Sequence, residues 1–249
     1  MGGKGGARHL KRLTAPRSWP IHVKEKKWTV KPKPGPHPAS RSIPLTIVLR
    51  DLLGYAKNAR EARIILSQGK VKVDGVVRRD GKYPVGLMDT LEIQDVNAKY
   101  RAIPLKKGLS LIQINEEESQ LKPCRIEGKT VVKGGHIQLN LHDGRNILVK
   151  VSDPKAPRED AYKPRDTLIL SLPDQKILKH VKFQENAYAL IISGRNAGKH
   201  GRITGFTPGT ATRRAVVSIQ DQNGETIQTV ADYVFILGDE KPEVKLAAG

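Results

Sequence analysis

The chain has 249 residues, a length that allows one large domain or two to three small ones. Its 44 Lys and Arg outnumber 25 Asp and Glu and give a formal charge of +19. Such an excess repels itself and is best explained by a polyanionic partner such as nucleic acid. The lone cysteine, Cys124, excludes an intrachain disulfide and a thiolate zinc cage and fits a reducing cytoplasm. No apolar run approaches the roughly 20 residues of a membrane span, so we expect no membrane partner.

Residues 1–42 predict a basic, extended N-terminal arm. They hold eleven Lys and Arg, six prolines and a single acid, Glu25, with almost no hydrophobic periodicity. We expect such a segment to become ordered only on binding. Its two tryptophans, Trp19 and Trp28, either anchor the arm on its own protein or stack on bases. The arm residues expected at RNA are Arg8, Lys11, Arg12, Arg17, Trp19, Lys24, Lys26, Lys27, Trp28, Lys31 and Lys33.

Residues 43–105 predict a compact helix–helix–hairpin unit. In PLTIVLRDLLGYA the apolar residues recur at helical spacing. A second helix is indicated after Asn58, which forms a capping-box pattern with Glu61. We expect that helix to bury one face made of Ala59, Ala62, Ile65 and Leu66.

A β-hairpin follows the second helix. Val71 and Val73 alternate with lysines before an Asp74-Gly75 turn, and DTLEI (89–93) predicts another strand. The clustering of basic residues off the apolar face favours phosphate contact over simple solvation. These residues are Lys57, Arg60, Arg63, Lys70, Lys72, Arg78 and Arg79.

The order helix, helix, then VKVDGV resembles the αL-type RNA-binding domain first described in a bacterial small-subunit ribosomal protein. The same domain is attached to pseudouridine synthases and some tRNA synthetases. In that family the second helix and the hairpin carry the RNA-facing surface. The resemblance therefore implies RNA contacts by Arg60, Arg63, Lys70 and Lys72.

Two β units complete the chain. Residues 106–173 predict a central small β domain, with a hairpin in HIQLNLHDGRNILVKV around Asp143-Gly144. Residues 152–166 are polar and proline-rich and predict an exposed loop. After residue 173, short strands separated by turn residues, including Asn223-Gly224, predict a small barrel and a short tail over 174–249.

A glycine-rich stretch, ISGRNAGKHGRITGF (192–206), does not fit a nucleotide-binding loop. Only three residues separate Gly194 from Gly198, and His200 stands where a P-loop needs a hydroxyl side chain. We interpret it as a turn between strands, whose glycines permit positive φ and close backbone approach. Its spacing resembles the KOW motif of ribosomal proteins and NusG-type transcription factors. That resemblance implies an SH3-like barrel with RNA contacts by Arg195, Lys199, His200, Arg202, Arg213 and Arg214; packing and solvation of a small barrel remain the alternative.

The combination of KRLTAPRSWP and PGPH in the arm, the αL unit, a central β domain and a KOW barrel resembles one family over the whole chain. It is the S-four-e family of archaeal and eukaryotic small-subunit ribosomal proteins. The end near Gly249 lacks the basic extension of eukaryotic members, so the archaeal form is expected. The resemblance implies an α+β multidomain structural constituent of the ribosome in the cytoplasm, with small-subunit rRNA and neighbouring ribosomal proteins as partners.

No catalytic site, cofactor, small-molecule substrate or metal site is expected. The seven histidines are scattered, and His136 and His142 near one turn have no cysteine partner at metal-ligand spacing. Two alternatives stay open on the residues alone. An RNA-modifying enzyme would need a large catalytic domain, for which the two β units leave no room. A NusG-like factor would share the KOW barrel.

Overall fold

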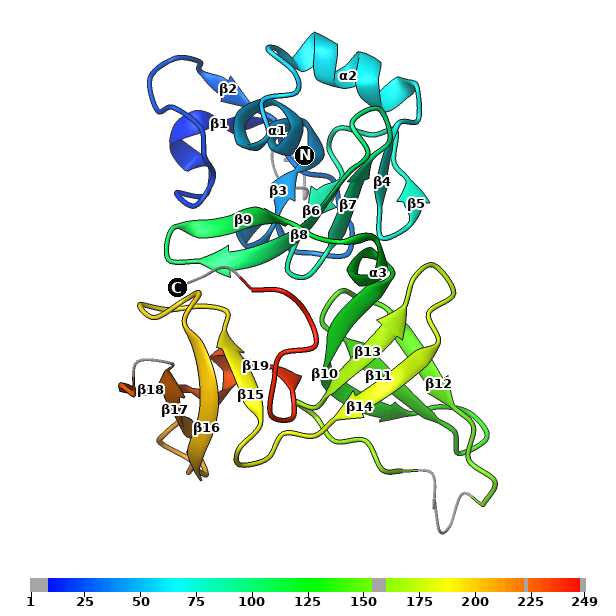
Figure 1. Ribbon diagram of the computed structural model, residues 1–249, viewed down its shortest axis with the longest axis vertical. Helices are drawn as coiled ribbons and strands as arrows, with labels where there is room; N and C mark the ends of the chain where they lie inside the picture. The colour runs from blue at the N-terminus through cyan, green and yellow to red at the C-terminus, as the bar shows by residue number, and fades with distance from the viewer. Residues whose placement is uncertain (1–8, 154–159, 222–223, 247–249) are drawn as a thin grey trace, which may run out of the picture.

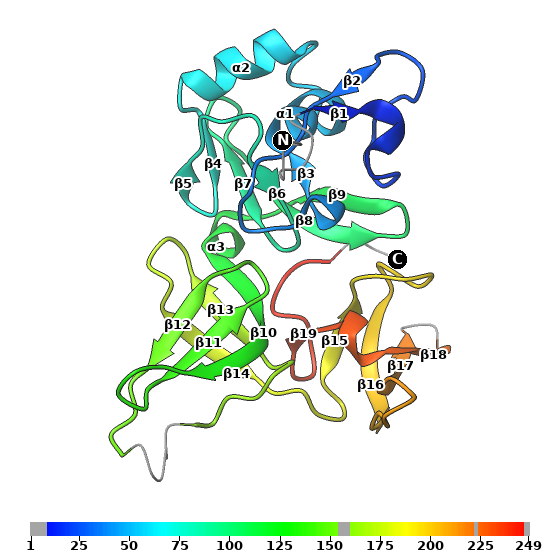
Figure 2. The same cartoon turned by 180° about the vertical axis from the view of Figure 1, so that it is seen from behind.

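The computed structural model describes residues 9–153, 160–221 and 224–246. It contains mixed α and β structure in which strands predominate. Three units meet at a central junction: the first lies above, and the central and last units lie side by side beneath it (Figures 1 and 2). Among the described residues, no helix combines the length and the apolar character that crossing a bilayer requires.

The first unit packs two short helical segments on a five-stranded sheet. Strand β3 (Ile43–Pro44) pairs with β6 (Pro84–Val85), and α1 (Leu45–Ile47) continues into a π-helical turn, η3 (Val48–Leu52). Helix α2 (Ala59–Ser67) follows. The sheet runs in the order β5-β4-β7-β8-β9, with bounds Val76–Val77, Val71–Val73, Thr90–Ile93, Ala98–Leu105 and Gly108–Gln113.

Most elements expected in this unit are present. The turn between β4 and β5 has positive φ at Asp74 (52°) and Gly75 (74°), as a two-residue hairpin of type I′ requires. Helix α2 buries Ala62 and Leu66, but Ala59 is exposed because it begins the helix, where the chain leaves the core. Strand β9 pairs with β8 along its whole length, so this sheet continues to Gln113, past the expected boundary at 105.

The arm is packed against the first unit over its described part, residues 9–42. Strands β1 (Leu10–Lys11) and β2 (Trp28–Thr29) pair with each other, and 3₁₀ turns η1 (Arg12–Thr14) and η2 (Ala39–Arg41) lie along it. Trp19 is 3% exposed and donates its indole N–H to the carbonyl of Ser42 at 2.8 Å. The expectation that the arm orders only on binding is therefore wrong for this part. Isolated apolar side chains of the arm pack against the core of the first unit. Because they are irregularly spaced, they give no periodic pattern in the sequence.

The central unit is an antiparallel sheet in the order β12-β11-β10-β13-β14. After the short helix α3 (Glu116–Ser119), its strands are β10 (Leu121–Val131), β11 (Ile137–Leu141), β12 (Asn146–Val149), β13 (Thr167–Ser171) and β14 (Ile177–Val181). The expected hairpin is confirmed by the pairing of Ile137 with Val149 and of Leu139 with Ile147. Strand β14 carries this sheet beyond the expected boundary at 173.

The last unit is an antiparallel sheet in the order β18-β17-β16-β15-β19, and its core also includes Ile169 and Val181 of the central sheet. Its elements are β15 (Tyr188–Ile191), β16 (His200–Thr207), β17 (Val216–Asp221), β18 (Thr226–Val230), the turn η4 (Ala231–Tyr233) and β19 (Val234–Gly238). Of the expected Asn223-Gly224 turn, Asn223 lies outside the described residues.

A separate apolar cluster joins the first and last units. Met88 from the first unit packs with Leu190, Phe235 and Leu237 from the last, and Val244 of the C-terminal segment covers them. That segment passes beneath the first unit in Figure 1. The units therefore share buried surface and form one body.

Replacing the buried indole tests whether the arm belongs to the folded body. Trp19→Ala should lower the free energy of unfolding by about 3–5 kcal/mol, because it removes a large core side chain. Trp28→Ala, at a side chain that is 51% exposed, should cost no more than about 1 kcal/mol. Urea unfolding followed by circular dichroism gives both values. Equal, small losses would contradict a docked arm.

Candidate nucleic-acid interface

Helix α2 presents two exposed arginines on one face. Its start is fixed by Asn58, whose side-chain oxygen accepts from the backbone N–H groups of Arg60 and Glu61, each at 2.9 Å. Glu61 accepts in turn from the backbone N–H of Lys57 at 2.7 Å. Arg60 and Arg63 lie one turn apart, and no carboxylate of the described chain pairs with either. Their guanidinium groups are thus available to neighbouring phosphates.

The basic residues of the hairpin are more engaged. The Nζ of Lys70 lies 2.7 Å from Asp95, and the Arg78 guanidinium lies over the Tyr83 ring, 4.4 Å from its centroid. Lys72 is half-buried opposite Glu92, whereas Arg79 is exposed. Of this group the structure leaves Arg79 the most open to a ligand.

The arm residues expected at RNA fall into two sets, one buried or already bonded within the protein and one exposed. Trp19 is buried, so it anchors the arm and we leave it out of the candidate surface. Arg12 binds the carbonyls of Ile21 and His22, and Lys33 pairs with Asp80. Lys31 is half-buried, and Arg8 lies outside the described residues. The exposed set is Lys11, Arg17, Lys24, Lys26, Lys27 and Trp28.

The glycine-rich segment of the last unit is a turn between β15 and β16, as expected. Gly194 and Gly198 both have φ near +90° (89° and 90°). A Cβ at Gly201 would meet the carbonyl oxygen of Gln220 at 2.0 Å, so β16 can approach β17 only with glycine there.

The basic side chains of the last unit that were expected at RNA differ in exposure. His200 is buried and hydrogen-bonds the Tyr188 hydroxyl at 2.7 Å, which leaves it out of the candidate surface. Lys199 lies 3.5 Å from Glu225. The exposed members are Arg195, Arg202, Arg213 and Arg214.

A buried charge cluster, absent from the expectations, joins the units. The ammonium group of Lys122 in β10 is fully buried and contacts three carboxylates, those of Asp74 and Asp89 at 2.6 Å and of Asp143 at 3.1 Å. Its three N–H donors are thereby matched. Asp74 and Asp89 belong to the first unit, and Lys122 and Asp143 to the central one. The Lys122 cluster is therefore an ionic joint between them.

Two further side chains extend the joint. Arg145 contacts Asp74 at 2.7 Å and Asp143 at 3.2 Å, and His37 of the arm contacts Asp89 at 3.0 Å. Arg125 in β10 donates to the backbone carbonyls of Asp232 and Val234, at 2.8 and 2.9 Å, in the last unit. The first and last units are thus tied to the central sheet, and the arm to the first unit, by hydrogen bonds that involve charged side chains.

Two effects set the pKa values of Lys122 and Asp89: burial disfavours their charged forms, and the neighbouring opposite charges favour them. Burial alone would lower the pKa of Lys122, but Asp89 and Asp74 outweigh it and raise that pKa well above its ordinary value. Burial would raise the pKa of Asp89, yet Lys122 and His37 hold it far below the usual range. These groups therefore stay ionised in the folded protein at neutral pH.

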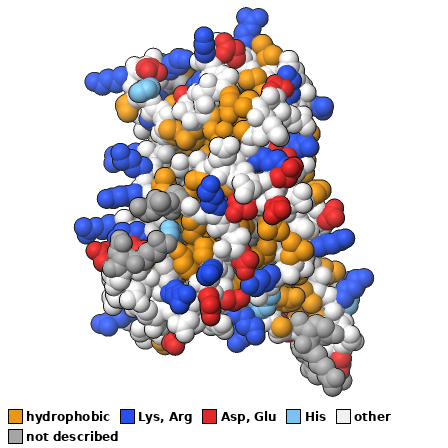
Figure 3. Space-filling view, in the orientation of Figure 1, with side chains coloured by type: hydrophobic (Ala, Val, Ile, Leu, Met, Phe, Trp, Pro, Cys, Tyr) orange, Lys and Arg blue, Asp and Glu red, His pale blue; other side chains and the backbone are white. Residues whose placement is uncertain are grey.

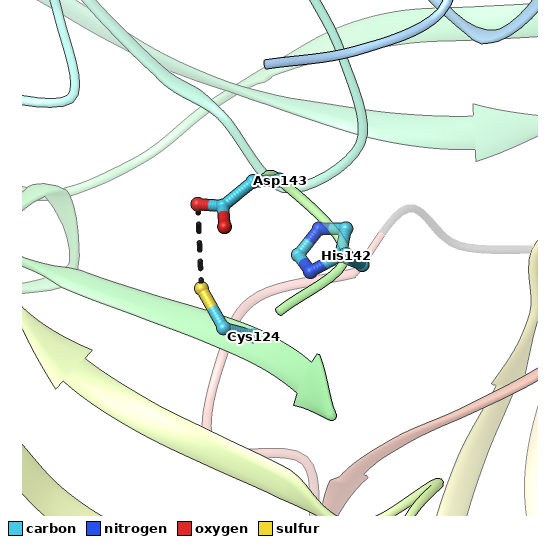
Figure 4. Close-up of side chains that lie close together, drawn as sticks. All are labelled: Cys124, His142 and Asp143. Carbon is cyan, nitrogen blue, oxygen red and sulfur yellow. Dashed lines mark hydrogen bonds between the residues drawn. The ribbon is translucent and has the colours of Figure 1, made fainter. Parts of the chain in front are cut away.

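Cys124, His142 and Asp143 form the one candidate metal-ligand set found among the described residues, with ligand atoms within 4.8 Å of one another (Figure 4). Their chemistry argues against an ion. The Cys124 thiol donates to Asp143 at 3.7 Å, and burial raises its pKa. His142 accepts from the backbone N–H of Arg125 at 3.2 Å through Nδ1, while its Nε2 faces the Leu87 carbonyl at 3.3 Å. Lys122, already on Asp143, would repel a cation.

The domains that match known protein families follow one another along the chain in the order of the structural units. Sequence profiles match the RS4NT domain over residues 4–40, the S4 domain over 44–91 and "Ribosomal family S4e" over 96–177. A small ribosomal subunit protein eS4 from Aeropyrum pernix is 52% identical over 100% of this chain and 99% of its own length. That of Staphylothermus marinus is 54% identical with the same coverage. The chain belongs to the ribosomal family S4e.

A solved member supports the fold of this S4e chain. The crystal structure of the 30S ribosomal protein S4e from Thermoplasma acidophilum is 31% identical, with a TM-score of 0.66, and the match covers 80% of this chain and 96% of that one. The S4-domain match coincides with the helix–helix–hairpin unit, which confirms that part of the expected fold. The family resemblance noted from the sequence is likewise confirmed.

Removing the buried cation tests the joint of this S4e chain. Lys122→Met should lower the free energy of unfolding by roughly 3–5 kcal/mol, because three carboxylates would lose their shared buried partner. Lys129→Met, which breaks a partly exposed pair with Asp160, should cost about 1 kcal/mol or less. Chemical denaturation measures both losses. Similar losses in the two variants would show that the cluster is not a joint.

His142 predicts a dependence of stability on pH. Burial, together with Lys122 and His37, outweighs the attraction of Asp143 and lowers the pKa of His142 to about 3. The unfolded chain binds that proton near pH ~6.5. Stability should therefore be full above that pH and fall toward pH 4.5 by up to about 1.4 kcal/mol per unit.

The variant His142→Asn keeps an acceptor for the Arg125 N–H group and should flatten this slope. The matched control is His22→Asn, at an exposed histidine, which should retain the parent slope. Thermal unfolding at pH 4.5–7 compares the three proteins. Parallel curves for the parent and His142→Asn would refute the assignment.

Proposed function

We propose that this chain is a structural constituent of the small ribosomal subunit that binds rRNA and stabilises its fold. The observation that carries the proposal is a sequence identity of 52–54%, over the full length, to proteins named small ribosomal subunit protein eS4. The family is structural, and the chain is not an enzyme. A NusG-like factor or an RNA-modifying enzyme would not account for similarity that also spans the arm and the S4 domain. Its place is then the ribosome, in the cytoplasm.

The distribution of charge supports rRNA as the partner. In the arm and on α2, exposed cations such as Lys24, Lys26, Arg60 and Arg63 pair with no carboxylate of the described chain. In the central and last units many cations are paired, among them Lys129 with Asp160. In Figure 3, Lys and Arg side chains project from the top and from both edges of the molecule. Exposed cations without a carboxylate partner suit a phosphate backbone.

We assign the main rRNA surface to the exposed arm residues with α2 and Arg79. The last unit is a second contact in this proposal, as a KOW-type SH3-like barrel using Arg195, Arg202, Arg213 and Arg214. All four side chains are exposed, which supports that role: Arg195 and Arg202 lie at the β15–β16 turn, and Arg213 and Arg214 lie in the β16–β17 loop at the other end of β16. The Lys122 cluster and the Arg125 hydrogen bonds connect the units that carry the two contact regions, so that both can engage a folded RNA together.

Charge removal on α2 tests the rRNA proposal. The double variant Arg60→Gln, Arg63→Gln should weaken binding to small-subunit rRNA. It should also flatten the log–log salt slope by about 1.4–1.8, since each phosphate contact contributes roughly 0.7–0.9.

The control Lys129→Gln, Lys179→Gln removes the same charge from residues already paired with carboxylates. Its slope should match the parent. Filter binding across a salt series measures all three proteins. Identical slopes for the α2 variant and the parent would contradict the assignment of the surface.

A further inference from the structure

A groove separates the arm from the helical side of the first unit. Its volume is about 540 Å³, within the range of small-ligand sites. One wall comes from the arm and the other from the segment between η3 and the start of α2. The lining residues that matter are Arg12, Ile21, Lys26, Trp28, Val30 and Lys57.

Trp28 lies at this groove, and the tilted ring of His9 contacts its indole with 5.6 Å between the ring centroids. The side chain is 51% exposed, and no described residue accepts a hydrogen bond from its ring N–H. Trp19 is the contrast, because its N–H is satisfied inside the core at 2.8 Å. Lys27 places its Nζ 5.5 Å from the Trp28 ring centroid. An exposed indole beside a cation offers a stacking surface next to a phosphate contact.

The groove is apolar inside and basic at its rim. Ile21, Val30 and Ala56 line it and pack against the core of the first unit. Lys26 and Lys57 also line it and are exposed, whereas the Arg12 guanidinium is held by backbone carbonyls. Two acids line it as well, Glu25 and Asp51, and Asp51 is already paired with Arg50 at 2.8 Å. The first N–H donors of α2 are taken by Asn58, so an anion has to use side chains.

We propose that this groove holds one unpaired nucleotide of rRNA, with its base against Trp28 and its phosphate against Lys26 and Lys57. The inference rests on the proposed function and specifies the kind of RNA that the arm recognises. A flat ring suits the apolar interior, and a polyanion suits the basic rim. A paired strand keeps its bases stacked on one another and has no base to insert.

Tryptophan fluorescence tests the inference, since a base stacked on an indole quenches it. The probes are a single-stranded oligouridine and an RNA duplex of equal length, each added to the full chain at low salt. The oligouridine should quench the parent protein, whereas the duplex should bind without quenching. Trp28→Phe, which retains buried Trp19 as its fluorophore, should bind the oligouridine with no quenching. Trp28→Ala should lose about tenfold in affinity for it, whereas Leu178→Ala, at an exposed leucine of the central unit, should lose none.

The outcomes separate this inference from the proposed function. If both RNAs bind and neither quenches Trp28, the groove does not hold a base, although rRNA binding stands. Quenching by an acidic peptide but not by oligouridine would assign the groove to a protein partner and overturn the inference. If neither probe nor small-subunit rRNA binds, the proposed function fails, and the inference fails with it.

Discussion

The buried ammonium group of Lys122 is the constraint on which the arrangement of units depends. It brings together carboxylates from the β4–β5 turn, the start of β7 and the β11–β12 turn. A buried ion pair often adds little stability compared with apolar packing, but removing one partner strands the other charges in a low dielectric. The Lys122 cluster therefore fixes the position of the central sheet relative to the first unit. Arg125 extends the same constraint to the last unit through two backbone carbonyls.

The chain uses its positive charge in two different ways. Inside the joint, cations are matched by carboxylates and serve to connect parts of the protein. In the arm and on α2, cations such as Lys24 and Arg63 are exposed without a carboxylate partner in the described chain. Part of the net charge of +19 thus lies on exposed side chains that no carboxylate of the described chain neutralises. That separation is what a protein embedded in RNA needs, because internal charges stabilise its shape and external ones meet phosphates.

Local signals in the sequence predicted local structure well. The Asp74-Gly75 pair indicated its hairpin, Asn58 indicated the start of α2, and alternation around Asp143-Gly144 indicated β11 and β12. Each depends on a few neighbouring residues. Whole-chain motifs likewise identified the family.

Contacts between distant residues could not be predicted in the same way. Lys122 reads as an ordinary strand lysine, and Asp74 as a turn residue, until the fold places them 2.6 Å apart. Trp19 gave no indication of whether it faced RNA or the core. The unit boundaries near 105 and 173 were misplaced because β9 and β14 pair backward with the preceding strand, a choice that local pattern does not reveal. The sequence predicted the arm side of the groove beside Trp28 only as part of a basic segment. The other wall, from Arg50 to Ala59, lies farther along the chain, and local pattern does not reveal that the two walls meet.

Lysine acetylation footprinting tests the central claim most directly, because it reads each cation separately in the intact protein. The full chain is acetylated with and without small-subunit rRNA, and modified sites are quantified by mass spectrometry. The account predicts strong protection by rRNA at Lys24, Lys26, Lys27 and Lys57, with little change at Lys129 and Lys179. Uniform protection of all six, or protection confined to the central sheet, would contradict it.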